Sequence, residues 1–159
     1  MIAAAAVRLA RGADAAEIAH ISRADIEHGL PWSWTADRVA SAIEDPDVNV
    51  AVIGEPGAIA AFGIMAYRDA TAHLLLFSVR APHRRRGVGS RLLLWLETVA
   101  REIGIERILL ECRRDNAPAR NFYAEHGYHE LAITRGYYRG LEDAVRLEKH
   151  LPRVADDSR

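Results

Sequence analysis

The run Leu74-Leu75-Leu76-Phe77-Ser78-Val79 and the loop Arg84-Arg85-Arg86-Gly87-Val88-Gly89-Ser90 follow each other in the chain, and this order indicates a strand, a tight loop and a helix. The run is apolar, has the length of a strand and stops before Pro82, which predicts a buried β-strand. After the loop, apolar residues recur at helical spacing up to Gly104, which predicts a helix that ends there. These residues are Val88, Leu92, Leu96, Val99, Ala100 and Ile103.

The glycine loop has the composition of a diphosphate-binding site. Gly87 and Gly89 carry no side chains, so backbone N–H groups can approach an anion, and the following helix adds the positive end of its dipole. Arg84, Arg85 and Arg86 supply mobile positive charge. The alternative is an ordinary strand-to-helix turn with solvated arginines. The loop has neither the Lys-Ser/Thr pair of a P-loop nor the third glycine of a dinucleotide-binding loop.

The bulk properties indicate one domain whose positive charge is local. A chain of 159 residues is long enough to bury about two-thirds of its unfolded surface. Its formal net charge of -1 provides no general field for nucleic acid or for an anionic membrane. Cys112 is the only cysteine, which excludes an internal disulfide and fits a reducing compartment. With no membrane-spanning run and no signal-peptide pattern, we expect a cytoplasmic protein that binds neither nucleic acid nor membrane.

The remaining residues predict a mixed α/β fold with a mostly antiparallel sheet and helices on both faces. Further strands are predicted at residues 7–9 with some preceding alanines, 48–53, 58–67, 105–112, 128–134 and 144–147. Helix caps are predicted at Asp14, Thr35 and Asn116. The strand at 105–112 must run parallel to the strand at 74–79, because a whole helix separates them. These two strands can splay apart where the glycine loop begins.

Two motifs resemble the signatures of one enzyme family, the GNAT acetyltransferases. Arg84, Gly87 and Gly89 fall on the acyl-coenzyme-A loop pattern Gln/Arg-x-x-Gly-x-Gly/Ala. The segment from Asn116 to Tyr128 resembles the second signature, Asn-x-x-Ala-x-x-Phe/Leu-Tyr-x-x-x-Gly-Phe/Tyr. The likeness covers nearly the whole chain and implies a GNAT domain at residues 1–151. The polar residues 152–159 are expected to form a frayed tail.

The resemblance implies acetyl-coenzyme A as the co-substrate and no metal ion. The implied coenzyme contacts are Phe77, Ser78, Val79, Arg84, Arg85, Arg86, Gly87, Val88, Gly89, Ser90, Asn116 and Tyr123. Asn116 is interpreted first as a helix cap and then as a contact to the pantetheine arm. The backbone N–H groups of Val79 and Arg80 are expected to stabilise the oxyanion that forms from the thioester.

Glu111 and Tyr123 are the candidate catalytic residues. Acetyl transfer from a thioester to an amine needs a neutral amine and help for the departing thiolate. Glu111 lies at the carboxyl end of an otherwise apolar strand, where desolvation would raise its pKa toward neutrality and suit it to act as the base. The alternative is a carboxylate paired with Arg113 or Arg107. Tyr123, which follows the core-facing Phe122, would donate a hydrogen bond to the thiolate; alternatively, it is a packed aromatic residue.

Within the family, the chain is most similar to RimI-type enzymes, which acetylate the N-terminal alanine of a ribosomal protein. The shared features are Pro31-Trp32-Ser33, Leu110-Glu111, Tyr137-Tyr138 and Glu142-Asp143-Ala144. The resemblance implies that Trp32, Glu111, Tyr137 and Tyr138 border the site of a peptide α-amine. For Trp32 and Tyr137 the alternative is surface packing. An α-amine with a pKa of about 7.8 is neutral far more often than a lysine at about 10.4, which suits a carboxylate base.

Three other functions are compatible with the sequence. The acceptor could be a small amine, an amino acid or an antibiotic. A non-catalytic acyl-coenzyme-A-binding module would need the glycine loop but neither Glu111 nor Tyr123. A nucleic-acid patch could combine residues 84–86 with 113–114, but the near-zero net charge and the lack of interleaved aromatic residues argue against it.

Overall fold

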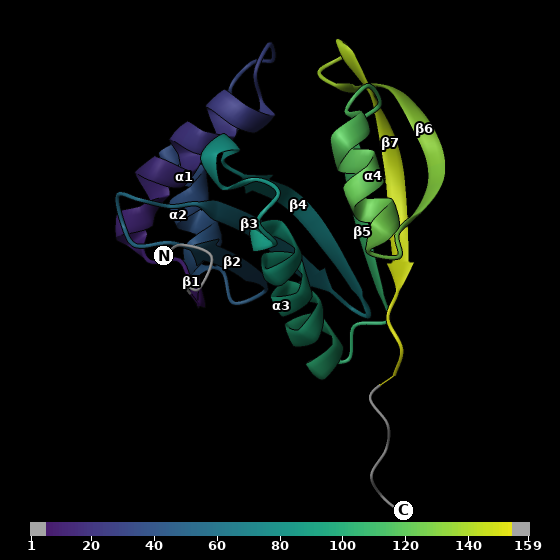
Figure 1. The fold of residues 1–159 in the computed structure, drawn as a ribbon, viewed down its shortest axis with the longest axis horizontal. Coiled ribbons are helices and arrows are strands. Elements are labelled where there is room, and N and C mark those ends of the chain that lie inside the picture. The colour runs from purple at the N-terminus through teal and green to yellow at the C-terminus, as the bar shows by residue number, and fades with distance from the viewer. Residues whose placement is uncertain (1–5, 154–159) are drawn as a thin grey trace, which may run out of the picture. The chain divides into compact units, whose positions relative to one another are not determined.

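The structure is a computed structural model that describes residues 6–153 and contains strands in the order β1-β2-β3-β4-β5-β7-β6 (Figure 1). One neighbouring pair, β4 and β5, is parallel, so the predicted mixed α/β class with a mostly antiparallel sheet is confirmed. Contacts divide the chain into two compact units, Met1–Ala66 with Leu74–Leu96 and Tyr67–His73 with Glu97–Arg159. The alanines expected to extend the first strand, and all but the first two residues of the predicted tail, lie outside the described residues.

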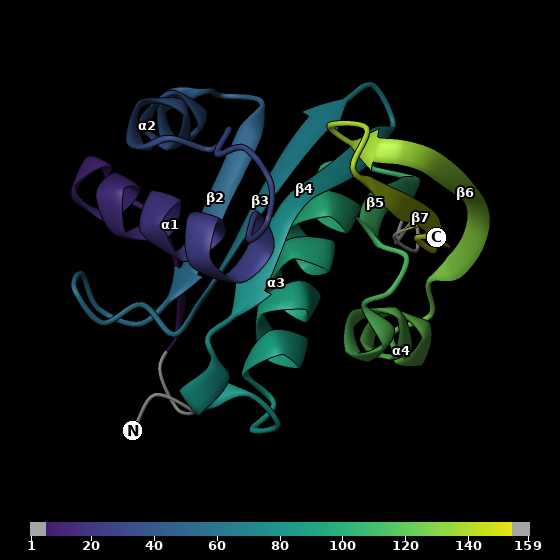
Figure 2. The same ribbon diagram turned by 90° about the horizontal axis from the view of Figure 1, so that it is seen from above.

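The first unit is a sheet covered by helices on both faces. Its elements are β1 (Val7–Leu9), α1 (Ala15–Ile21), a π-helical turn (Ser22–Ile26), α2 (Ala36–Glu44), β2 (Val48–Ile53), β3 (Ala61–Arg68, up to residue 66), most of β4 (Thr71–Val79) and the first part of α3 (Val88–Glu102). Strand β2 pairs antiparallel with β1 and with β3. Helices α1 and α2 cover one face of these strands, and α3 lies on the other (Figure 2).

Glycine lets α3 approach β3 closely. A Cβ atom added at Gly63 would lie 2.9 Å from Leu96 Cδ1, a distance that real Cβ contacts do not reach. On the opposite face, a cluster of fully buried side chains joins the helices to the strands. Its largest members are Ile18, Ile21, Phe62 and Ile64. Both faces of the sheet are therefore buried, as is usual when helices cover a sheet on two sides.

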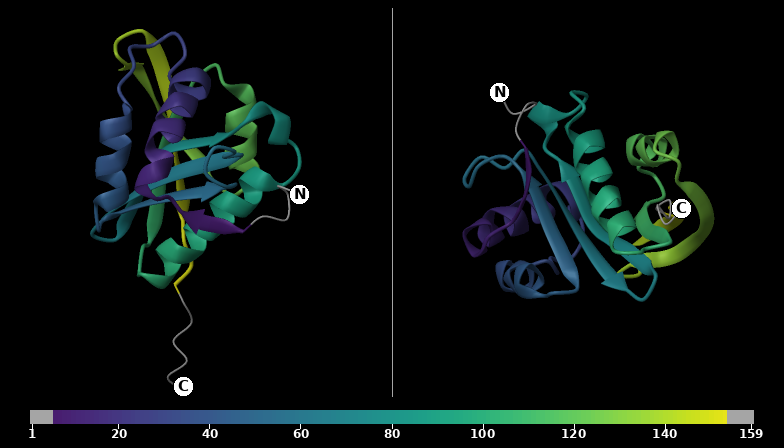
Figure 3. Two further views of the ribbon diagram at one scale, coloured as in Figure 1. Left: turned by 90° about the vertical axis from the view of Figure 1, so that its left-hand side faces the viewer. Right: turned by 90° about the horizontal axis from the view of Figure 1, so that it is seen from below.

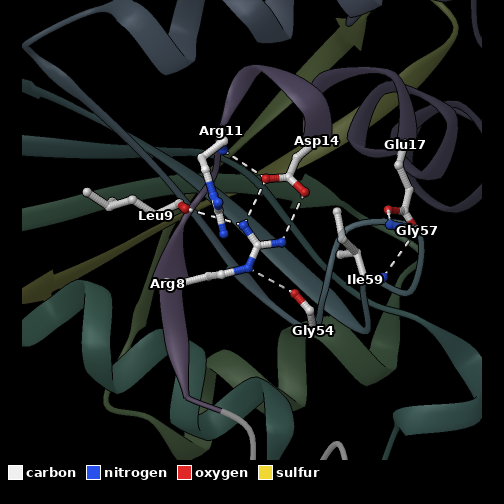
Figure 4. A network of polar contacts seen from close by, with 8 residues as sticks. All are labelled: Arg8, Leu9, Arg11, Asp14, Glu17, Gly54, Gly57 and Ile59. Carbon is white, nitrogen blue, oxygen red and sulfur yellow. Dashed lines mark hydrogen bonds and ion pairs between the residues drawn. The ribbon is translucent and has the colours of Figure 1, made fainter.

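Asp14 does not cap α1, contrary to the prediction, because its carboxylate binds an arginine (Figure 4). Arg8 Nη1 and Nη2 donate to the two Asp14 oxygens at 2.8 and 3.0 Å, and the Arg11 N–H donates to Oδ2 at 2.8 Å. Arg8 Nε also donates to the Gly54 carbonyl at 3.0 Å. The Asp14 side chain is fully buried. This pair ties β1, the start of α1 and the turn after β2 together.

Strand β4 alternates between buried and exposed residues. Leu74, Leu76 and Ser78 are buried, whereas Leu75 is 37% exposed. The expectation of a run buried along its whole length was therefore wrong at Leu75. The prediction followed hydrophobicity alone, whereas side chains in a strand point alternately to opposite faces. His73, on the same strand, belongs to the second unit.

The second unit contains the end of α3, β5 (Arg107–Arg113), α4 (Ala117–Glu125), β6 (His129–Tyr138) and β7 (Glu142–His150). Strand β7 pairs antiparallel with both β5 and β6, so the last strand of the chain lies between them. Helix α4 lies alongside these three strands (Figures 1 and 3). Asn116 caps this helix as predicted, because its side-chain oxygen accepts from the Ala119 N–H at 3.2 Å.

A buried polar cluster joins α3 to β7. Glu97, which is 2% exposed, accepts from the Tyr128 hydroxyl at 2.7 Å and from Lys149 Nζ at 3.0 Å. Lys149 is the only lysine in the sequence. The chain's one lysine is thus held in an ion pair.

Candidate active site

The glycine loop of the first unit turns the chain from β4 into α3. A short 3₁₀ turn at Ala81–His83 follows β4, and the Arg91 N–H donates to the Gly87 carbonyl at 3.1 Å in the first turn of α3. Arg84 Nε donates to the Val79 carbonyl at 2.8 Å, which fixes the start of the loop. Gly87 has φ of 75°. Few residues other than glycine adopt this left-handed conformation without strain.

This loop fits a diphosphate. Arg84, Arg85, Arg86 and Gly87 are exposed, and a Cβ atom at Gly87 would have no neighbour within 4 Å. The space in front of the backbone is therefore open, at the N-terminus of a helix of 15 residues. Helix N-termini with mobile arginines nearby attract anions.

Arg80 does not offer a free oxyanion donor, contrary to the prediction. Its N–H donates to the Ala60 carbonyl at 2.9 Å. Its guanidinium lies 3.7 Å from Asp25. The sequence could not show that β4 continues pairing up to this residue.

Trp32 lies on a loop that a buried carboxylate holds in place. Glu27 is 7% exposed and accepts from Ser22 Oγ at 3.0 Å. It also accepts from Ser33 N and Oγ at 2.8 and 2.6 Å and from Trp34 N at 3.3 Å. Trp32 itself is 40% exposed and carries the Arg23 guanidinium 5.1 Å from its ring centre. Glu27 was not among the predicted site residues, although it stands only four positions before Pro31-Trp32-Ser33 in the sequence.

Glu111 lies in the second unit with two basic partners. Its side chain, on β5, is 6% exposed. His73 Nε2 lies 2.5 Å from Oε2, and Arg146 Nε and Nη2 lie 3.1 and 3.0 Å from Oε1. Neither Arg113 nor Arg107 is its partner, because these bind Glu142 and Glu148 respectively. Both carboxylate oxygens are therefore held.

The pKa of Glu111 is lowered, so the predicted rise toward neutrality is wrong. Burial by itself raises the pKa, but the hydrogen bonds and positive charges of His73 and Arg146 outweigh burial. The prediction considered only the apolar strand. At neutral pH Glu111 is an ionised carboxylate and a weak base.

Tyr137 and Tyr138 follow each other at the end of β6, with ring centres 4.9 Å apart in an edge-to-face arrangement. Tyr137 is 45% exposed, and burial together with the charge of Glu111 raises its pKa. Tyr138 is less exposed, and burial raises its pKa too. Tyr137 thus shares the surroundings of Glu111 within the second unit.

Tyr123 is buried in α4, and Phe122 is only half-buried, which reverses the predicted orientation of the two residues. The Tyr123 ring lies edge-to-face with Phe122 and Tyr128, at 5.3 and 5.6 Å between centres. Burial, together with the neighbouring Cys112 and Tyr138, raises its pKa. The hydroxyl therefore keeps its proton at any physiological pH and can donate a hydrogen bond.

Residues 6–153 contain a further surface feature of note. An open depression of about 450 Å³ in the second unit contains none of the predicted site residues; it is lined by Arg114, Asp115, Arg120, Leu141, Glu142 and Asp143. In that range no cluster of three or more His, Cys, Asp or Glu residues could hold a metal ion. None of the helices described there is long and apolar enough to cross a bilayer.

The predicted residues fall into two groups. The first unit carries Trp32 and the loop at residues 84–90, and the second carries Glu111, Tyr123, Asn116, Tyr137 and Tyr138. His73 and Arg146 were missed. Arg146 stands opposite Glu111 in the β5–β7 register, which local sequence patterns do not encode. His73 could have been predicted from the sequence, because the parallel pairing of β4 and β5 brings polar residues on these two strands together.

Comparisons with known proteins agree with the motifs. A sequence profile of the Acetyltransferase (GNAT) family matches residues 15–128. The ribosomal protein bS18-alanine N-acetyltransferase of Escherichia coli strain K12 is 32% identical over 121 residues, covering 74% of this chain and 80% of that protein. An N-alpha-acetyltransferase of Sulfurisphaera tokodaii is 34% identical over 76 residues, covering 47% of this chain and 46% of that enzyme.

A solved structure agrees with the fold. The crystal structure of the ribosomal-protein-S18-alanine N-acetyltransferase from Escherichia coli superposes with a TM-score of 0.78 at 27% identity, covering 96% of this chain and 97% of that chain. The predicted resemblance to RimI-type enzymes is thereby confirmed. The chain belongs to the GNAT family of acetyltransferases, and it is an N-acetyltransferase that uses acetyl-coenzyme A.

Proposed function

We propose that this enzyme acetylates the α-amine of a peptide or protein N-terminus by direct attack on the thioester of acetyl-coenzyme A. The loop at residues 84–90, with Phe77, Ser78, Val79 and Asn116, binds the coenzyme. Glu111 receives the acceptor amine, and Tyr123 assists the departure of the thiolate. Trp32, Tyr137 and Tyr138 contact the peptide.

The coenzyme role of the loop is supported by its backbone. Gly87, with its left-handed φ and open surroundings, lets the N-terminal amides of α3 approach a diphosphate. Arg85 and Arg86 are exposed and supply the countercharge. Arg84 also positions the loop, since its hydrogen bond to the Val79 carbonyl holds the loop against the end of β4.

The lowered pKa of Glu111 is the observation that best supports an α-amine as the acceptor. A carboxylate with a lowered pKa is too weak a base to deprotonate a lysine, whose pKa is about 10.4. An α-amine at about 7.8 reaches its neutral form at physiological pH and needs only a proton acceptor that orients it. His73 fixes the second carboxylate oxygen at 2.5 Å and keeps that orientation. His73 is therefore a positioning residue.

Tyr123 suits hydrogen-bond donation better than full proton transfer. Burial keeps its proton bound, so complete transfer to a thiolate, whose conjugate acid has a pKa of about 8.5, is strongly uphill. A donated hydrogen bond still stabilises the charge that develops on the sulfur. The proton that finally reaches the thiolate comes from the acceptor ammonium.

The E. coli relative supports a protein N-terminus as the acceptor, because its name states that it acts on an alanine of a ribosomal protein. We therefore expect acetylation of a free N-terminal alanine. The test is incubation of the enzyme with acetyl-coenzyme A and a mixture of ribosomal proteins, followed by intact mass measurement and fragmentation. The expected result is one added acetyl group at an N-terminus. Acetyl groups found only on lysines, or on no protein, would refute the proposal.

A further inference from the structure

Arg146 occupies one side of the Glu111 carboxylate. The two residues face each other across the β5–β7 pair. Arg146 Nε and Nη2 converge on the single oxygen Oε1, at 3.1 and 3.0 Å, while His73 holds Oε2. The negative charge of Glu111 is therefore balanced by its own neighbours before any acceptor arrives.

The Arg146 guanidinium has N–H groups that do not bind Glu111. A guanidinium has five N–H groups, and the contacts with Glu111 use two of them. Within residues 6–153 the arginine has no other hydrogen-bond or ion-pair partner, and its side chain is 46% exposed. The remaining N–H groups can thus bind an anion, and a carboxylate matches their planar geometry best.

The two charges together form a zwitterionic pair about 3 Å apart. An amine without a carboxylate of its own gains less from Glu111 than it would from an unpaired carboxylate, because the positive charge of Arg146 lies beside the same oxygen. An acceptor that carries its own carboxylate next to the ammonium is complementary to both groups. Its ammonium meets Glu111 and its carboxylate meets the free edge of Arg146.

We propose that Arg146 favours acceptors in which a carboxylate lies within one residue of the reacting amine over uncharged N-termini such as alanine, which react more slowly. The inference rests on the proposed function, in which Glu111 receives the amine. Two sources supply this chemistry: the side chain of an N-terminal aspartate or glutamate, and the α-carboxylate of a free amino acid. A carboxylate farther along a peptide does not reach the same guanidinium.

The test compares kcat/KM, expressed per concentration of neutral amine, for isosteric acceptors, because a neighbouring carboxylate also raises the pKa of the amine. One arm uses two peptides that differ only in an N-terminal glutamate or glutamine, and the other uses alanine and alaninamide. Because a charge-assisted hydrogen bond distinguishes each pair, the wild type should prefer the carboxylate member of at least one pair by about tenfold. Arg146→Met should reduce this ratio to about one, and Arg146→Lys should restore part of it.

Arg107→Met is the matched control. Arg107 is 44% exposed, lies on β5 and pairs with Glu148 at 2.9 Å, so it is a similarly exposed, paired arginine whose partner is not Glu111. This variant should keep the wild-type ratio. A ratio near one for both pairs in the wild type, or a ratio that survives in Arg146→Met, overturns the inference. If only alanine is acetylated and no peptide is, the proposed peptide acceptor fails while the selection by Arg146 stands.

Discussion

Burial raises the pKa of Glu111 and its charged, hydrogen-bonding neighbours lower it, and the neighbours have the larger effect. Its pKa lies below the ordinary value, so the residue is ionised throughout the neutral range. The rate should therefore follow deprotonation of the acceptor amine, rising with pH up to about 8. Had the pKa been raised toward neutrality, the wild-type advantage over Glu111→Gln would have shrunk at low pH, where the carboxyl group would be protonated.

We expect Glu111→Gln to lower kcat/KM by about a hundredfold, and by a similar factor at every pH between about 6 and about 9. The measurement is a pH–rate profile of both enzymes with one N-terminal alanine peptide. Parallel profiles agree with a lowered pKa. A wild-type advantage that changes steeply across this range would mean that Glu111 titrates there.

Tyr123→Phe isolates the phenolic hydroxyl. Phenylalanine keeps the ring contacts with Phe122 and Tyr128, so folding and coenzyme binding should change little. We expect kcat to fall by about tenfold or more, because a hydrogen bond to the leaving thiolate is lost. Calorimetry with coenzyme A and steady-state kinetics separate the two effects. An unchanged kcat would remove the hydroxyl from the mechanism.

In the first unit, an ion pair between Arg8 and the buried Asp14 joins β1 to the start of α1. Arg8 lowers the pKa of Asp14, chiefly through its hydrogen bonds. A carboxylate with a lowered folded-state pKa stabilises the fold above its unfolded pKa, and this stability is lost as the pH falls through the folded value. The loss should set in below about pH 4.

Asp14→Asn should lower the free energy of unfolding by about 3 kcal/mol at neutral pH, because it leaves a partly buried arginine without its partner. The difference from wild type should shrink in acid. Urea unfolding at neutral pH and near pH 3 measures it. Asp47→Asn, at an exposed position, is the control and should change stability little. Equal stability of Asp14→Asn and wild type at neutral pH would show that the pair contributes nothing.

Gly87, in the turn into α3, is the residue whose substitution tests the coenzyme loop. Gly87→Ala should weaken coenzyme A binding about tenfold, because the methyl group stands where the diphosphate must approach the amides. Gly57→Ala is the matched control for Gly87→Ala, since Gly57 also has a positive φ and open space around an added Cβ atom. Both variants should lose about 1 kcal/mol of stability from backbone strain. Calorimetric titration should show weaker binding only for Gly87→Ala; equal binding by the two variants would contradict the role of the loop.

Local chemistry was enough to predict much of the whole molecule. The caps Thr35 and Asn116 and the glycine at the end of α3 act within a few residues, and each was predicted correctly. The fold class followed from the glycine loop between two parallel strands. Asp14 failed as a cap because Arg8, on another element, binds its carboxylate.

What the sequence could not predict depends on pairing between distant segments. The insertion of β7 between β5 and β6 places Arg146 opposite Glu111, and nothing in either segment encodes that register. The wrong pKa expectation for Glu111 follows directly, since both of its partners lie on other strands. The Arg80 N–H was likewise wrongly predicted to be a free donor, because it binds the carbonyl of Ala60, which lies 20 positions earlier in the chain.

Acetylation of one synthetic peptide distinguishes an α-amine acceptor from a lysine acceptor. The peptide has a free N-terminal alanine and one internal lysine, and a copy with a blocked N-terminus is the control. After incubation with acetyl-coenzyme A, fragmentation mass spectrometry locates the added group. We predict a single acetyl group on the α-amine of the free peptide and none on the blocked copy. Acetylation of the lysine in both peptides would contradict an enzyme in which the ionised carboxylate of Glu111 serves an α-amine.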